Sequence, residues 1–246
     1  MIIVEVTTYR ATLYSPLFYS SSEGVLISAD QILGSTALTY SLAYNLGLLK
    51  KHYFLFGDAA VNHRYQELAD IGLFVTDGKP IDVNYKEETF KSTEYLSERS
   101  LTVSKGDKNC MGIFRRADPS GMSSDSPPLI NRVRRYIGLA PGSTFEFTVW
   151  SKEPLPDDIF LTVGIRRSGE LRLRKTELAD RVHLNLYMLK EVYGIGEQHT
   201  DDEQITLFDI YNASGKFVRG SDYRKQHFLD VDFKFVDDKI IPSIFR

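Results

Sequence analysis

Alternation of apolar and polar residues predicts strands in several parts of the chain. Within residues 228–236, the apolar residues at 229, 231, 233 and 235 alternate with the charged residues at 230, 232 and 234. Residues 144–151 place three apolar side chains on one face and Trp150, the only tryptophan, on the other. A period of two is that of an extended strand with one face in the core. We also expect strands at residues 2–13, 71–76 and 159–163.

A different spacing predicts one helix in the first half of the chain. Leu38, Leu42 and Leu46 recur every four residues, and Gly47 stands where a helix C-terminal cap belongs. This amphipathic helix should lie on a sheet. Residues 179–193 fit either a strand or a helix, and both assignments stay open.

The order of these elements predicts an α+β fold. The chain begins with a strand, a helix and a strand, and further strands follow with turns between them that are typical of antiparallel connections. This order is compatible with a ferredoxin-like core in a single domain, residues 1–246. Regular patterns fade between residues 84 and 128, which are rich in Ser, Lys, Gly, Asp and Asn. A long irregular insertion in a compact domain is usually functional or disordered.

Positive charge is concentrated in two segments of a chain whose formal net charge is −3. Residues 99–135 hold eight Lys or Arg against three Asp, and residues 166–175 hold five against one Glu. Such segregation attracts a polyanion to one place, so we expect nucleic acid as the partner. In and next to the second segment, Arg166, Arg172 and Arg174 share one parity and aliphatic residues share the other. If this stretch is a strand or hairpin, the arginines lie on one side, and Gly169 is expected to supply a turn.

The sequence also argues against a disulfide-stabilised, zinc-binding, membrane-spanning or nucleotide-hydrolysing protein. The single cysteine, Cys110, excludes an internal disulfide and a zinc cluster of thiolates. No apolar run approaches the ~18 residues of a membrane span, and the start lacks a basic region before a long apolar core. Glycine-containing segments lack the spacing of a phosphate loop. We therefore expect a cytoplasmic protein without a membrane anchor, metal or other cofactor.

Two segments of the chain are informative about its family. The first is Ser-Thr-Ala-Leu-Thr-Tyr-Ser-Leu-Ala-Tyr-Asn-Leu-Gly-Leu at residues 35–48. The second is Leu-Ala-Pro-Gly-Ser-Thr-Phe-Glu-Phe-Thr-Val-Trp-Ser at residues 139–151, followed by Pro-Leu-Pro and a basic strand at 163–175. In sequence and in order, the two segments resemble the Cas-five (Csc-one) subunits of type I-D CRISPR Cascade.

The resemblance implies an RNA-recognition-motif-like (RRM-like) antiparallel core with a long basic thumb, here residues 85–135. It implies a subunit that grips the 5′ handle of the guide RNA (crRNA), caps the antiviral effector complex and contacts its backbone and large subunits; contact with target DNA is left open. The side chains expected to bind RNA are cationic, or are aromatic platforms for splayed bases: Phe114, Arg115, Arg116, Arg132, Arg134, Arg135, Tyr136, Arg166, Arg167, Arg172, Arg174 and Lys175.

Two other functions are weighed against this one. A metal-independent ribonuclease that processes guide precursors would need a histidine as general acid or base, and His52 and His63 each stand beside basic and tyrosine residues. In the family that the chain resembles, processing is assigned to another subunit, so we do not expect an enzyme. A scaffold whose basic segments contact acidic proteins is the third hypothesis.

Overall fold

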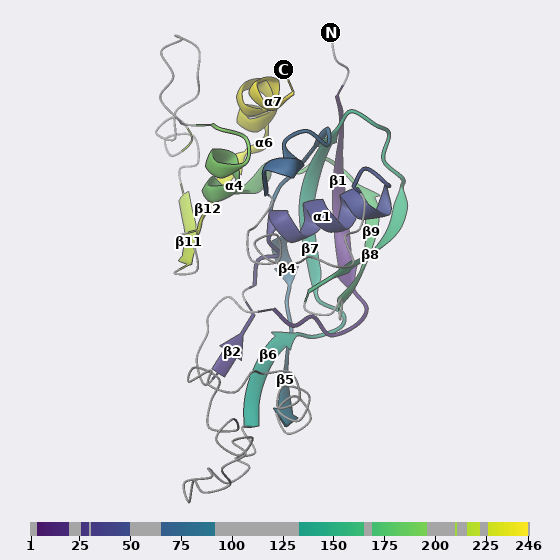
Figure 1. Cartoon of the computed structure of the whole chain (residues 1–246), viewed down its shortest axis with the longest axis vertical. Coiled ribbons are helices and arrows are strands. Elements are labelled where there is room, and N and C mark those ends of the chain that lie inside the picture. The colour runs from purple at the N-terminus through teal and green to yellow at the C-terminus, as the bar shows by residue number, and fades with distance from the viewer. Residues whose placement is uncertain are drawn as a thin grey trace, which may run out of the picture.

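The structure is a computed structural model that describes residues 4–19, 26–29, 31–49, 65–91, 133–164, 169–195, 210, 216–221 and 226–245. The described strands form one six-stranded sheet and two three-stranded sheets. Figure 1 shows the six-stranded sheet behind a helix, one small sheet beside it and the other projecting from one end.

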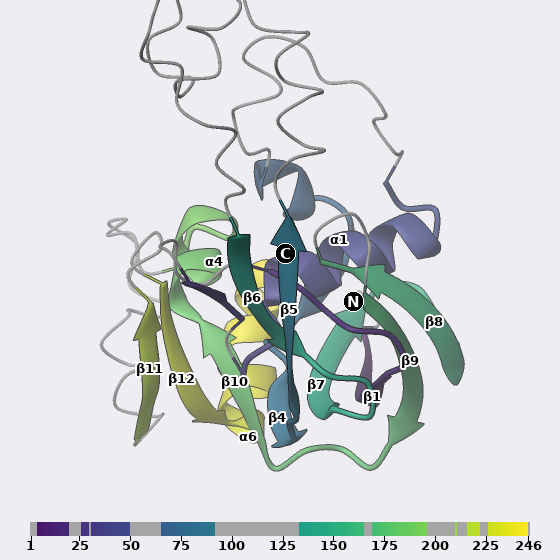
Figure 2. The same ribbon diagram turned by 90° about the horizontal axis from the view of Figure 1, so that it is seen from below.

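The six-stranded sheet is antiparallel throughout and forms the centre of the molecule. Its order is β3-β7-β1-β9-β8, and β4 pairs with β7 on the same side as β3. The sheet is curled, as the view from below shows (Figure 2). Its strands are β1 (Glu5–Leu13), β3 (Leu73–Val75), β4 (Lys79–Asp82), β7 (Thr144–Ser151), β8 (Asp158–Val163) and β9 (Gly169–Thr176).

Helix α1 (Ser35–Asn45) covers the inner face of this sheet. Leu38 and Leu42 of the helix share one buried cluster with Phe147 of β7 and with Leu171 and Leu173 of β9. The four-residue leucine spacing and the two-residue strand spacing point these side chains at one another. Each such fully buried side chain contributes about 1.5–3 kcal/mol through the hydrophobic effect.

The C-terminal part forms a second core on the other side of the sheet. Strands β10 (Arg181–Asn185), β12 (Gln226–Asp232) and β11 (Lys216–Ser221) pair in that order. The side chains of Phe74 on β3 and Trp150 on β7 point away from the inner face and pack in this second core, so they connect it to the main sheet. The Trp150 ring stacks on Phe233 with ring centroids 5.6 Å apart, and its Nε1 donates to Asp237 Oδ1 at 2.7 Å.

Short helices complete this second core. They are α4 (Leu186–Glu191), α6 (Phe233–Phe235), a π-helical turn η5 (Val236–Ile240) and α7 (Ile241–Ile244). A short 3-10 helix, η1 (Tyr65–Leu68), precedes β3.

A third sheet projects from one end of the molecule (Figure 1). Strand β6 (Val133–Leu139) lies between β2 (Leu26–Ser28), which is parallel to it, and β5 (Tyr85–Lys91), which is antiparallel. The base of this sheet is tied to the rest of the chain by a bridge between Leu17 and Leu139. Strands β5 and β6 therefore form the stem of the basic segment that the sequence predicts as a thumb.

The predicted elements agree with the structure except at their ends. The strand expected at 228–236 stops at Asp232, whose side chain accepts hydrogen bonds from the N–H groups of Lys234 and Phe235 and so starts a helix. Residues 179–193, for which the sequence allowed either a strand or a helix, contain one of each. Strand β10 ends at Asn185, whose side chain caps α4 by accepting from the N–H of Tyr187 at 3.0 Å.

Two local predictions were wrong. Residues 85–91 are a strand rather than irregular chain, because their backbone pairs with β6. Gly169 is not in a turn but is the first residue of β9, opposite Val163. A Cβ atom at Gly169 would lie 2.8 Å from Leu17 Cδ1, so close packing requires glycine there.

The α+β, mostly antiparallel fold is as predicted, whereas a ferredoxin-like, RRM-like core is not confirmed. Helix α1 connects β1 to β3, which run parallel with β7 between them, as in one split βαβ unit. A second such unit needs a helix between β7 and β9. The described residues of that connection instead form β8, at the sheet edge.

Both edges of the main sheet have side chains bound to outward-facing carbonyl groups. At β8, the Phe160 carbonyl accepts from Asn45 Nδ2 and the Thr162 carbonyl from Ser41 Oγ, both at 2.8 Å. At β3, the Leu73 carbonyl accepts from the Tyr193 hydroxyl at 3.1 Å.

Candidate nucleic-acid interface

Charged and aromatic side chains gather on the surface of β8, β9 and β1 that faces away from α1. In β9, Leu171 and Leu173 are fully buried, so Arg172 and Arg174 between them face outward, as the parity predicts. The register sets Phe160 opposite Arg172 and Asp158 opposite Arg174. We call this surface the outer arginine face; its residues are Arg10, Tyr14, Asp158, Phe160, Arg172 and Arg174.

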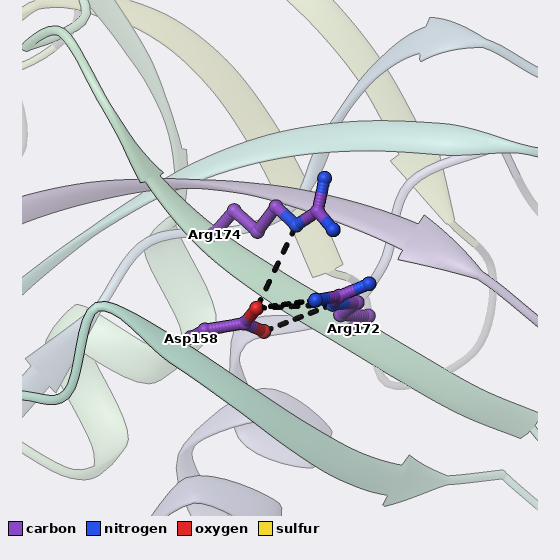
Figure 3. A network of polar contacts seen from close by, with 3 residues as sticks. All are labelled: Asp158, Arg172 and Arg174. Carbon is purple, nitrogen blue, oxygen red and sulfur yellow. Dashed lines mark hydrogen bonds and ion pairs between the residues drawn. The ribbon is translucent and has the colours of Figure 1, made fainter.

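Arg172 is fixed at the centre of the outer arginine face (Figure 3). Its Nε donates to both Asp158 oxygens at 3.0 and 3.1 Å, and its Nη2 donates to Oδ2 at 2.5 Å. Its guanidinium carbon lies 5.4 Å from the centroid of the Phe160 ring. The hydrogen bond from Arg172 holds the pKa of Asp158 below its usual range, and the bonds to Asp158 and Tyr14 raise the pKa of Arg172. Both partners of the pair therefore stay charged.

Arg174 is much less constrained than Arg172. Its Nε lies 3.7 Å from Asp158 Oδ2, and 61% of its side chain is exposed. Directly opposite, on β1, is Arg10, which is also exposed. The two arginines thus lie opposite each other on neighbouring strands, and both side chains are exposed to solvent.

Lys175 does not belong to the outer arginine face. It has the parity of Leu171 and Leu173 and stands opposite Tyr9, whose ring is in the inner core. Its Nζ lies 2.9 Å from Asp157 Oδ1 and 3.6 Å from Glu5 Oε1, and the hydrogen bond to Asp157 raises its pKa. Although Lys175 directly follows Arg174 in the sequence, its side chain contacts carboxylates on the other side of β9.

The remaining predicted RNA-binding residues lie apart from the outer arginine face or outside the described residues. In the projecting sheet, β6 sets Arg134 opposite Phe90, Arg135 opposite Thr89 and Tyr136, which is half-buried, opposite Glu88. The two basic segments therefore contribute to different sheets. Outside the described residues are Phe114, Arg115, Arg116, Arg132, Arg166 and Arg167, as well as His52 and His63.

Sequence reasoning missed Arg10, Tyr14 and Phe160. Arg10 stands between two buried residues, Tyr9 and Ala11, which is the signature of an outward position in a strand. That signal predicts exposure of one arginine. Only the register of β1 against β9 brings it beside Arg174.

A buried polar group joins α1 to the second core. Asp77 is fully buried, and its Oδ1 accepts from the N–H of Ser35 at 2.6 Å, at the first turn of α1. Its own N–H donates to the His183 carbonyl at 2.9 Å. Burial raises the pKa of Asp77 to about 7 and lowers the pKa of His183 to about 4. A carboxyl group this enclosed is part of the architecture, since no substrate reaches it.

The part of the chain that the structure describes holds neither a cluster of metal ligands nor a membrane-spanning helix. Within it, no three His, Cys, Asp or Glu side chains are grouped so as to hold a metal ion. Its helices are all too short or too polar to cross a membrane.

Comparison with known proteins gives the family. No curated protein matches the chain significantly. Among solved structures, it aligns with a chain of the cryo-EM structure of the Type III-B Cmr-beta bound to cognate target RNA and AMPPnP. The alignment covers 97% of this chain and 90% of that chain, with 12% sequence identity and a TM-score of 0.35. The model of the type I-D CRISPR-associated protein Cas5/Csc1 family matches residues 4–225. Because this match spans most of the sequence, the chain belongs to the type I-D CRISPR-associated Cas5/Csc1 family.

Proposed function

We propose that this chain is the guide-RNA-binding subunit of a type I-D CRISPR effector complex and that it grips the 5′ handle of the guide. Membership of the Cas5/Csc1 family supports a subunit of a CRISPR effector. The observation that carries the RNA-binding role is the pair of exposed arginines, Arg10 and Arg174, that lie opposite each other on neighbouring strands, with only a long 3.7 Å contact from Arg174 Nε to Asp158. Guanidinium groups bind phosphate oxygens in a planar, two-pronged geometry.

The position of the basic segment in the fold supports the same role. Strands β5 and β6 pair from Tyr85 opposite Leu139 to Lys91 opposite Val133. Most of the basic segment at 99–135 is therefore inserted between two paired strands that project from the body (Figure 1). Such a stem can carry the cations toward an RNA strand, and we propose residues 85–135 as the thumb.

The mechanism is electrostatic and needs no covalent step. Each phosphate that a Lys or Arg neutralises releases condensed counterions, which favours binding at low salt. Arg174 and Arg10 would hold a phosphate of the handle, and the cations of the thumb would bind other phosphates. Positioning the guide, with neighbouring subunits on either side, is the whole task of such a subunit.

A salt titration of RNA binding tests this function. The full chain is titrated with a short single-stranded RNA of the guide's 5′ handle at several salt concentrations, with affinity read by anisotropy of an end label. The slope of log K against log salt should be about −3 to −6 for a handful of contacts, at roughly −0.7 per phosphate. A flat response would refute guide binding.

Two variants make the measurement specific. Arg174→Ala should weaken binding and make the slope shallower by about 0.7. Lys190→Ala is the matched control, because Lys190 is an exposed cation on α4, 3.9 Å from Glu191 and outside the outer arginine face. An equal effect of both substitutions would mean that only net charge matters. The ribonuclease alternative is tested separately by incubating a guide precursor with the full chain in EDTA. Cleavage that is lost in His52→Ala or His63→Ala would support a ribonuclease instead.

A further inference from the structure

We propose that the outer arginine face is a nucleotide-binding site, in which Arg10 and Arg174 hold one phosphate and Phe160 with Tyr14 stacks the attached base. This inference rests on the proposed function and assigns to the RNA strand a specific contact on the curled sheet. Tyr14, Phe160 and Arg10 become binding residues that the charge pattern does not identify.

The phosphate position follows from two like charges set side by side. Arg10 and Arg174 are directly opposite in the β1–β9 register, an arrangement that costs stability in an antiparallel sheet. Across the sheet, the residues in register are Asp158 on β8, Arg174 on β9, Arg10 on β1 and Glu146 on β7. The two carboxylates therefore flank the pair of arginines and do not lie between them. Among the described residues none forms an ion pair with Arg10, and Arg174 is 3.7 Å from Asp158. An anion between the two guanidinium groups would remove the repulsion.

The base position follows from two exposed aromatic rings. Among the described residues, five large apolar side chains are exposed, and two of these, Tyr14 at 51% and Phe160 at 54%, contact each other. Their ring centroids are 5.9 Å apart and the rings meet edge to face at 65°. Leaving such rings in water is unfavourable, and rings of this kind stack the bases of single-stranded nucleic acids irrespective of sequence.

Arg172 is a positioning residue in this site. Its guanidinium is occupied by Asp158 and lies over the Phe160 ring. The Arg172 guanidinium thereby covers one face of the Phe160 ring, and the exposed remainder of the ring is accessible to a base. Its charge also keeps Asp158 occupied, so this carboxylate is less able to compete for Arg174.

The spacing of the two positions suits one nucleotide. Phe160 is opposite Arg172, two residues from Arg174, so Phe160 and Arg174 are diagonal neighbours on the same face. Diagonal neighbours in an antiparallel pair lie about 7–8 Å apart. A phosphate at the arginine pair and its own base at the aromatic pair can occupy the site together. An acidic protein surface would use the arginines but would leave the aromatic rings unused.

The test uses the full chain and handle RNAs that each carry one 2-aminopurine, moved through the sequence. Stacking on an aromatic ring quenches this base, so one position should be quenched more than the others on binding. Phe160→Ala should abolish that quenching and lower affinity about 5- to 150-fold. Phe160→Tyr should preserve both, and Arg10→Ala should make the salt slope shallower by about 0.7.

Controls separate this inference from the proposed function. Leu178→Ala removes another exposed apolar side chain, 51% exposed after the end of β9, and should change neither readout. If the wild-type chain binds RNA but Phe160→Ala and Arg10→Ala behave like wild type, this site is wrong while guide binding stands. If the wild-type chain does not bind RNA, both fail. If Phe160→Ala leaves RNA binding intact and weakens association with the other effector subunits, the face contacts protein and the inference is overturned.

Discussion

Replacing Asp77 by asparagine should stabilise the folded protein above neutral pH. The carboxyl group is fully buried, and burial is the main reason that its pKa rises from an ordinary 3.8 to about 7. One pKa unit corresponds to about 1.4 kcal/mol. The difference of about three units means that ionised Asp77 costs the folded state up to about 4 kcal/mol, relative to its protonated form.

The sign of the pH dependence follows from proton binding. Between pH 4 and 7 the folded state holds a proton on Asp77 that the unfolded chain has released. The free energy of unfolding therefore falls as the pH rises through this range and is highest, for this group, below pH 4. Asparagine cannot ionise, and its amide oxygen can still accept the hydrogen bond from the Ser35 N–H.

Urea unfolding followed by circular dichroism between pH 4.5 and 8.5 measures the effect. The free energy of unfolding of Asp77→Asn should exceed that of wild type by about 2–4 kcal/mol at pH 8, and the difference should fall to about 1 kcal/mol near pH 4.5. Asp82→Asn, at an exposed carboxylate on β4, is the matched control and should follow the wild-type curve. If Asp77→Asn is less stable than wild type at pH 8, the first turn of α1 favours the ionised carboxylate more than burial disfavours it, and the reasoning fails.

Three further outcomes are expected. The His183 imidazole, whose pKa burial lowers to about 4, should stay neutral down to about pH 5 by NMR, and titration near 6.5 would contradict its burial. Because the unfolded chain takes up this proton first, the contribution of His183 to stability should decline as the pH falls below about 6.5, opposite in sign to that of Asp77. Leu173→Ala removes a fully buried side chain and should cost about 2–5 kcal/mol in urea unfolding, whereas a cost below 1 kcal/mol would mean that the inner core refills the space. Trp150→Phe loses the hydrogen bond to Asp237 and should cost about 1–2 kcal/mol, and an unchanged melting temperature would show that this bond adds nothing.

The strands and the main helix could be predicted because their signal is local. The parity of Leu171 and Arg172 in β9 follows from the two-residue period of any strand with one buried face, and the structure confirms it. The same rule places Lys175 on the opposite side from Arg174. Reading 166–175 as one basic cluster therefore overlooked the geometry that the alternation itself implies.

The candidate site depends on pairings that no local pattern contains. Arg10 and Arg174 are more than 160 positions apart in the sequence and meet only through the β1–β9 register. The strand at 85–91 was missed for the same reason, because its composition is polar and its order comes from β6. Asp158 is another such case, since a carboxylate that occupies Arg172 is recognised only when β8 and β9 are paired.

The side chains that bind the edge carbonyls of the main sheet have a consequence for how the sheet meets neighbouring protein chains. An open antiparallel sheet invites a strand from another molecule to add at its border, which is the usual route to aggregation. Ser41 and Asn45 occupy acceptors on β8, and Tyr193 occupies one on β3. These three hydrogen bonds leave fewer backbone acceptors for a strand of another molecule to pair with, so they disfavour lateral growth of the sheet.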